Sequence, residues 1–118
     1  MNTASASLES LTAVRKAMAY WAERWDWESP TLFGINLEQL RQVLAEWPTI
    51  APGTENEAEC ASIGALRELL YGASAVVAAK VPAIVGLSFH QAEALLSELH
   101  ALAEQRGGVA VERPGYGT

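Results

Sequence analysis

The side chains that most often carry out chemistry in proteins are scarce in this sequence, which contains one aspartate, one cysteine and two histidines. His90 and Glu93 have a spacing that could supply half of a metal site, since positions three apart share a helix face. His100 cannot complete that half-site, because ten helical residues place it about 15 Å further along the axis. We therefore expect no metal and no bound cofactor.

Cys60 is the only residue that could supply a thiolate nucleophile. A reactive thiolate needs positive charge nearby, whereas Cys60 has Glu59 beside it and no cation close in sequence. The sequence also lacks a phosphate-binding glycine loop, a Cys-x-x-Cys pair and a nucleophile elbow. These observations predict a protein that is not an enzyme. A single cysteine excludes an internal disulfide and favours a reducing cytoplasm.

The overall charge restricts the kinds of partner. The formal net charge is −6 and the sequence pI is about 4.8. Nucleic acids and anionic membrane surfaces are disfavoured, because both require clustered Lys and Arg. A basic protein would be attracted, although mild acidity can also serve only to keep the domain soluble. The N-terminus lacks the plan of a signal peptide, and the apolar stretch 73–89 is too short to span a bilayer. These features predict a cytoplasmic protein.

The first candidate surface lies at the end of a helix expected over residues 8–27. Tyr20 and Trp27 are seven residues apart and would share the face opposite the apolar stripe. Asp26 and Glu28 stand where the helix dipole favours cations. Because local rules are broken most often at functional sites, we interpret this end as a partner-binding surface. The alternative is that a neighbouring segment covers the two aromatic rings.

A second candidate surface is acidic throughout. No Lys or Arg occurs between Gln42 and Leu66, and this segment contains four of the glutamates that we assign to partner binding. They are Glu46, Glu55, Glu57 and Glu59. An alternative explanation for part of the group is that carboxylates are favourable in the first turn of a helix.

Four amphipathic helices are expected to position these residues. The first ends before Pro30, and the second begins at an Asn36–Gln39 capping box and runs to Trp47. A third should run from about Glu55 to Lys80, after a Thr54–Glu57 capping box. A fourth should begin at a Ser88–Gln91 capping box and end near Arg106. The segment 107–118 has no periodicity and is expected to be a flexible tail.

The two halves of the chain resemble each other at an offset of 52 residues. Eight identities occur between residues 10–47 and 62–99, where chance would give two or three. The matches include Pro30 with Pro82 and Gly34 with Gly86. We therefore expect one all-α domain over residues 1–118, a four-helix bundle made of two hairpins over about 8–47 and 55–106. The alternative is coincidence between two similar hairpins.

These observations favour a non-enzymatic protein–protein interaction domain. A concrete version is an acidic immunity or antitoxin-type protein that inhibits a basic partner. One alternative is a homodimer formed through small residues on the third helix, namely Ala61, Gly64, Gly72, Ala75 and Ala79. Another is a small-molecule binder with a pocket between the hairpins, lined by Trp21, Trp25, Trp47 and Phe33.

Overall fold

The computed structural model describes residues 7–106, which are all-helical and contain no strand. The predicted all-α class is therefore confirmed. Six α-helices follow one another: α1 (Leu8–Ala22), α2 (Ser29–Phe33), α3 (Leu37–Glu46), α4 (Glu55–Tyr71), α5 (Val81–Val85) and α6 (Phe89–Gln105). A 3₁₀ turn, η2 (Ala78–Lys80), leads into α5. The tail expected over 107–118 lies outside the described residues.

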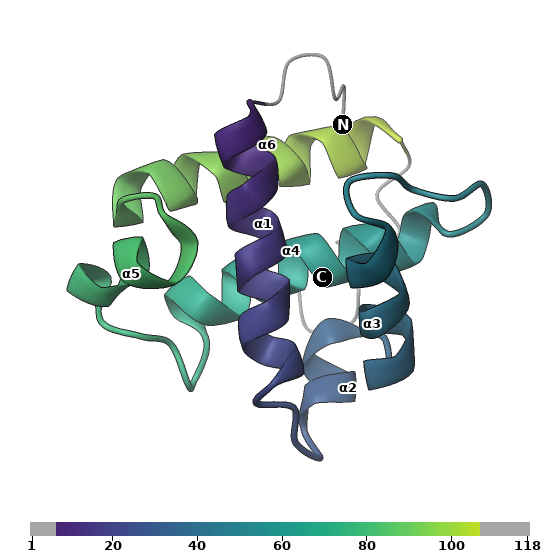
Figure 1. Ribbon diagram of the computed structural model, residues 1–118, viewed down its shortest axis with the longest axis horizontal. Coiled ribbons are helices and arrows are strands. Elements are labelled where there is room, and N and C mark those ends of the chain that lie inside the picture. The colour runs from purple at the N-terminus through teal and green to yellow at the C-terminus, as the bar shows by residue number, and fades with distance from the viewer. Residues whose placement is uncertain (1–6, 107–118) are drawn as a thin grey trace.

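Helix α4 is the central element of the fold. It packs against α1, α2, α3 and α6, and eleven of its seventeen residues are buried. Helix α1 passes in front of α4 and α6 instead of lying alongside them (Figure 1). The expected four-helix bundle is not confirmed, because six helices form and the long helices cross.

Short helices stand where Pro30 and Gly34 of the first half match Pro82 and Gly86 of the second. Helices α2 and α5 each span five residues, with a proline in the first turn. Each ends at a glycine in the left-handed region, Gly34 at φ 78° and Gly86 at φ 81°, where other residues are strained. The last side chains of these helices, Phe33 and Val85, are buried and close the core.

Two of the three predicted capping boxes are confirmed. The Asn36 side chain accepts from the Gln39 backbone N–H at 2.8 Å, and the Gln39 side chain accepts from the Asn36 N–H at 2.8 Å. Ser88 and Gln91 make the same pair of bonds at the start of α6. The third box is wrong, because the Thr54 hydroxyl donates instead to the carbonyl of Ala51 at 2.7 Å.

The two capping boxes should contribute equally to stability. Asn36→Ala and Ser88→Ala are each expected to lower the free energy of unfolding by about 1 kcal/mol, because each leaves a helix N–H without its acceptor. Urea denaturation measures this change, and Ser97→Ala, at an exposed position inside α6, serves as the control without a cap to lose. A loss for Ser97→Ala as large as the other two would contradict the assignment.

Two predicted helix ends are wrong. Helix α1 ends at Ala22 and not near Trp27, and α4 ends at Tyr71 and not near Lys80. Gly72 caps α4 in an extended conformation, with ψ at 176°, so the chain leaves the helix there.

The small residues expected on one face of the third helix therefore do not form a continuous stripe. Ala61 and Gly64 are buried within the chain. A Cβ on Gly64 would lie 2.8 Å from Cδ2 of Phe33, so this glycine admits the phenyl ring of α2. The other three residues of the stripe, Gly72, Ala75 and Ala79, lie beyond the end of α4. A homodimer stays a prediction, but the surface proposed for it is wrong.

Candidate functional site

The turn between α1 and α2 is held by the carboxylate of Asp26. Its Oδ1 accepts from the backbone N–H of Glu28 at 2.9 Å and of Ser29 at 3.2 Å, and from the Ser29 hydroxyl at 3.1 Å. The Ser29 hydroxyl in turn accepts from the Asp26 N–H at 3.1 Å. The predicted conflict with the α1 dipole is therefore wrong, because Asp26 lies at the start of α2, where a negative charge is favourable.

Tyr20 and Trp27 do not share a helix face, because Trp27 lies in the turn that follows α1. The Trp27 side chain is 86% exposed. Tyr20 is half-buried, with its ring edge against Trp21 at a centroid distance of 5.0 Å. The guanidinium of Arg24 lies 3.8 Å from the centre of the Tyr20 ring. Tyr20 is thus fixed between two neighbours, while Trp27 projects from the surface.

A hollow of about 180 Å³ lies between the end of α1, α2 and the end of α4. We call it the corner hollow. Its walls include three of the predicted partner-binding residues, Tyr20, Asp26 and Glu28. Glu68 of α4 completes the acidic side of the hollow, although it is far away in sequence. The fold therefore gathers aromatic and carboxylate groups around one concave surface.

Glu68 was not among the residues predicted to bind a partner. It is buried, and its Oε2 lies 3.0 Å from Nε of Arg67. A signal was present, because Glu68 is the one charged residue that interrupts the small-residue face of α4. Charged side chains are rarely buried unless they are paired, so such an interruption indicates either a salt bridge or a site.

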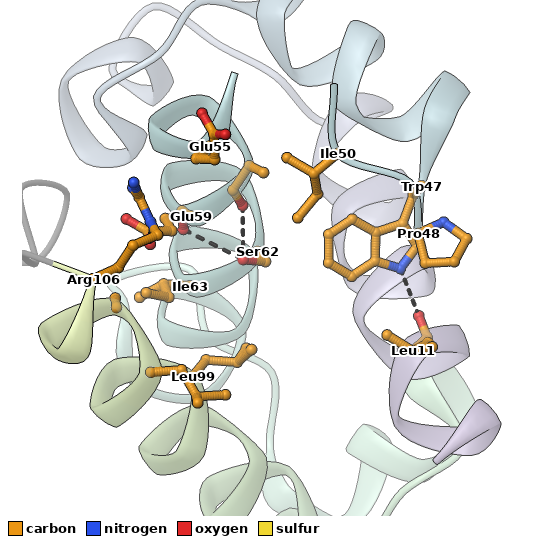
Figure 2. Close-up of a pocket in the computed structure, with 13 residues that line it drawn as sticks. Leu11, Trp47, Pro48, Ile50, Glu55, Glu59, Ser62, Ile63, Leu99 and Arg106 are labelled. Atoms are coloured by element: carbon orange, nitrogen blue, oxygen red, sulfur yellow. Dashed lines mark hydrogen bonds and ion pairs between the residues drawn. The ribbon is translucent and has the colours of Figure 1, made fainter. Parts of the chain in front are cut away.

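The second acidic group does not form one surface. Glu55 and Glu59 line a cavity between α1, α4 and α6 (Figure 2), whereas Glu46 and Glu57 line a separate hollow of about 80 Å³. Two of these carboxylates also interact with other groups of the chain. Glu59 forms an ion pair with Arg106, and Glu55 accepts from the backbone N–H of Gly53 at 3.0 Å.

The pocket expected to be lined by three tryptophans and a phenylalanine does not form. Trp21 and Trp25 pack on Phe33, with centroid distances of 6.3 and 5.0 Å. The Trp21 indole also donates to the buried carbonyl of Ala65 at 2.9 Å. Trp47 is separate from this group and lines the cavity beside Glu59.

Within residues 7–106, no three His, Cys, Asp or Glu side chains are grouped so that they could hold a metal ion. His90 is exposed, with Nδ1 at 3.6 Å from Oε1 of Glu93. His100 is half-buried on the same helix. Burial lowers the pKa of His100 below its ordinary value of 6.5, and the positive charge of Arg67 lowers it further.

His100 should make stability depend on pH. Its pKa is lower in the folded chain than in the unfolded chain, so the unfolded chain binds the proton more tightly. The free energy of unfolding should be highest above pH 6.5 and fall as the pH drops from 6.5 to the lower folded pKa. Urea denaturation between about pH 5 and 8 measures this. His100→Gln should reduce the slope and the control His90→Gln should keep it, whereas equal slopes in all three proteins would contradict the prediction.

No helix within the described part of the chain has the length and apolarity needed to cross a membrane. The chain matches no protein-family model, and neither a curated protein nor a solved structure was found to be similar to it.

Proposed function

We propose that this chain is a non-enzymatic interaction domain that binds a basic protein at the corner between α1 and α2. The observation that carries the proposal is the corner hollow, in which Tyr20, Asp26, Glu28 and Glu68 converge beside the exposed Trp27. Aromatic anchors next to charged groups are typical of the residues that dominate binding energy at interfaces.

The chemistry of the hollow favours a cationic side chain of the partner. Three carboxylates and Arg24 line it, so their formal charges sum to −3 + 1 = −2. Counting Arg67, which pairs with Glu68, still leaves −1. An arginine of the partner would place its guanidinium among the carboxylates of the hollow. Trp27 would then cover the apolar stem of that arginine or of a neighbouring side chain.

The overall charge supports the same partner class. A net charge of −6 attracts a basic protein over a distance and accelerates its association at low salt. An immunity or antitoxin-type inhibitor of a basic toxin in the cytoplasm is the concrete form of this proposal.

Argininamide is a suitable probe of the hollow. Titrated into ¹⁵N-labelled protein, it should cause saturable shifts of the backbone amides of Arg24 to Ser29. Glu28→Lys should abolish these shifts because it places a cation at the rim. Glu38→Lys, an equal charge change at an exposed position of α3, should preserve them. If both substitutions weaken argininamide binding equally, the binding depends only on the overall charge of the chain. This result would contradict the proposed site.

The protein partner can be sought with the same pair of variants. Immobilised wild-type and Glu38→Lys chains should retain a basic protein from a lysate of the source cells and release it as salt rises. The Glu28→Lys chain should not retain that protein. Retention of the same protein by all three columns would place its binding site elsewhere on the chain.

We also infer that the two halves are copies of one hairpin. Helices α2 and α5 begin 52 residues apart, at Ser29 and Val81, and end 52 residues apart. The contacts match as well, because α1 packs on α3 and α5 while α4 packs on α6 and α2. Superposition of the halves in an experimental structure tests this, and helices that match in order but not in direction would contradict it.

A duplication would explain why only one corner binds. The segment equivalent to Asp26, Trp27 and Glu28 in the second half is η2, the exposed Ala78–Lys80. It carries neither an aromatic ring nor a carboxylate. The corner between α1 and α2 would therefore be the one that diverged to bind a partner.

A further inference from the structure

A second concave site lies away from the corner hollow. It is a cavity of about 230 Å³ between α1, α4, the end of α6 and the segment that follows α3. Figure 2 shows Trp47 and Ile50 on one side of this cavity and Ile63 and Leu99 on another. Apolar walls of this kind favour a ligand with an apolar body, and an aromatic body would also suit the Trp47 indole.

The wall formed by Trp47 is held in place by hydrogen bonds. Its indole Nε1 donates to the carbonyl of Leu11 at 2.9 Å, as Figure 2 shows. Arg15 of α1 donates from Nη1 to the carbonyl of Leu44 at 3.0 Å and to that of Trp47 at 3.4 Å. These bonds tie the end of α3 to α1, so a ligand would meet a preformed surface.

Arg106 is the polar group that a ligand in this cavity can reach. Its Nε pairs with Oε2 of Glu59, whereas its Nη1 and Nη2 make no hydrogen bond within residues 7–106. The Arg106 side chain is 41% exposed, so the guanidinium can keep its bond to Glu59 and still donate to a ligand. Glu59 and Arg106 lie together on the side of the cavity across from Trp47 (Figure 2).

The charges around Arg106 disfavour an anionic ligand. Glu59 neutralises the guanidinium, and Glu55 adds a second carboxylate to the wall, so the formal charges sum to −2 + 1 = −1. The hydrogen bond to Glu59 raises the pKa of Arg106 above its ordinary value, and the negative charges of Glu59 and Glu55 raise it further. A carboxylate ligand would compete with Glu59 and be repelled by Glu55, whereas a carbonyl oxygen accepts a hydrogen bond without adding charge.

A cationic ligand has no open partner on this side of the cavity. Oε1 of Glu59 is buried and Oε2 is paired with Arg106, so neither oxygen is available to a ligand. Glu55 already accepts from the backbone N–H of Gly53 at 3.0 Å. An ammonium group would also be repelled by the guanidinium of Arg106. The ligand that complements this wall is therefore neutral and carries a hydrogen-bond acceptor.

We propose that this cavity binds a small neutral carbonyl compound with an aromatic body, of the aralkyl ketone class, whose oxygen accepts from an Nη of Arg106. The size is appropriate: a cavity of roughly 150 Å³ holds benzene, so the larger volume here suits about eleven non-hydrogen atoms. The proposal does not depend on the corner hollow, and either site can be disproved without the other.

Three compounds with the same carbon body and different polar groups provide the test. The neutral ketone 4-phenyl-2-butanone, the anion 3-phenylpropionate and the cation 4-phenyl-2-butylammonium are titrated separately into the ¹⁵N-labelled full chain. The indole N–H signal of Trp47 should shift saturably with the ketone, at a dissociation constant on the order of 1 mM or below. Both ions should bind at least about tenfold more weakly. The Trp21 indole signal, from a buried group outside the cavity, should stay in place.

Substitutions at the ion pair test the role of Arg106. Arg106→Met keeps an apolar stem and removes the donors, so it should weaken ketone binding by roughly tenfold. Arg41→Met, an equal charge change at an exposed position of α3, should leave ketone binding unchanged. Glu59→Gln removes the charge that neutralises Arg106, so 3-phenylpropionate should then bind about as tightly as the ketone.

The order of the three compounds on the wild-type chain decides the proposal even if a variant does not fold. Binding of either ion as tightly as the ketone would overturn it. The absence of a saturable shift of the Trp47 signal up to about 10 mM ketone would do the same. Equal ketone binding by the wild-type and folded Arg106→Met chains would also overturn it, because the oxygen would then not be held by Arg106.

Discussion

Phe33→Ala is expected to lower the free energy of unfolding by about 4 kcal/mol. The Phe33 ring is only 3% exposed and lies between Trp25 of the corner and Gly64 of the central helix. Its removal would leave a void that the five-residue α2 closes only by moving the corner. Urea denaturation followed by far-UV circular dichroism measures the loss. Leu32→Ala, at the exposed neighbouring position, should cost less than about 1 kcal/mol.

The effect of Gly64→Ala on the free energy of unfolding should have opposite signs with phenylalanine and with alanine at position 33. In the wild-type chain the added methyl would lie 2.8 Å from the Phe33 ring, so the substitution should cost about 1 to 3 kcal/mol. In the Phe33→Ala background the ring is gone, and alanine should stabilise the helix by up to about 1 kcal/mol. A double-mutant cycle measures the coupling. If the effects of the two substitutions are additive, the Phe33 ring and Gly64 are not energetically coupled.

The sequence predicted the helical class and several boundaries, because those features depend on local chemistry. The capping boxes at Asn36 and Ser88 mark helix starts through bonds that span three residues. The short helices α2 and α5, which precede Gly34 and Gly86, were not predicted, since five residues are too few to show a helical period.

The site was predicted only in part, because long-range contacts decide it. Asp26 and Glu28 were located correctly as neighbours, but the error in the end of α1 reversed the electrostatic role of Asp26. Glu68 reaches the corner hollow only because α4 packs on α2. Similarly, Glu59 and Arg106 are 47 residues apart, and no pattern in the sequence pairs them. Such pairings follow from the crossing of helices, which periodicity does not specify.

Gly72 caused the largest boundary error. Apolar residues continue at helical spacing beyond it, through Ala73, Val76 and Val77, so the pattern predicted a helix as far as Lys80. In the structure, Gly72 adopts an extended conformation that ends α4. The glycine was interpreted as a small residue for helix packing, although glycine at such a position is also a common stop signal.

Gly72→Ala distinguishes these two interpretations by the sign of its effect. In the structure, a Cβ at this position would clash with Oε1 of Glu68 and would lie 2.9 Å from its carbonyl oxygen and 3.0 Å from its Cα. Two of these three atoms belong to the backbone, so rotation of the Glu68 side chain cannot relieve the clash. We expect a loss of about 2 kcal/mol in the free energy of unfolding, measured by urea denaturation.

Two further variants separate the sources of this loss. Glu68→Ala removes the side-chain clash together with the ion pair to Arg67, so the reference for the double variant is Glu68→Ala alone. Relative to that reference, Gly72→Ala should still cause most of the loss. Ser74→Ala, at an exposed position two residues further on, should change stability by less than about 0.5 kcal/mol. If α4 instead continued through position 72, Gly72→Ala would stabilise the chain by about 1 kcal/mol and raise its helical dichroism. That outcome would also change the wall of the corner hollow, because Ala73 and Ser74, which line it, follow Gly72 in the chain.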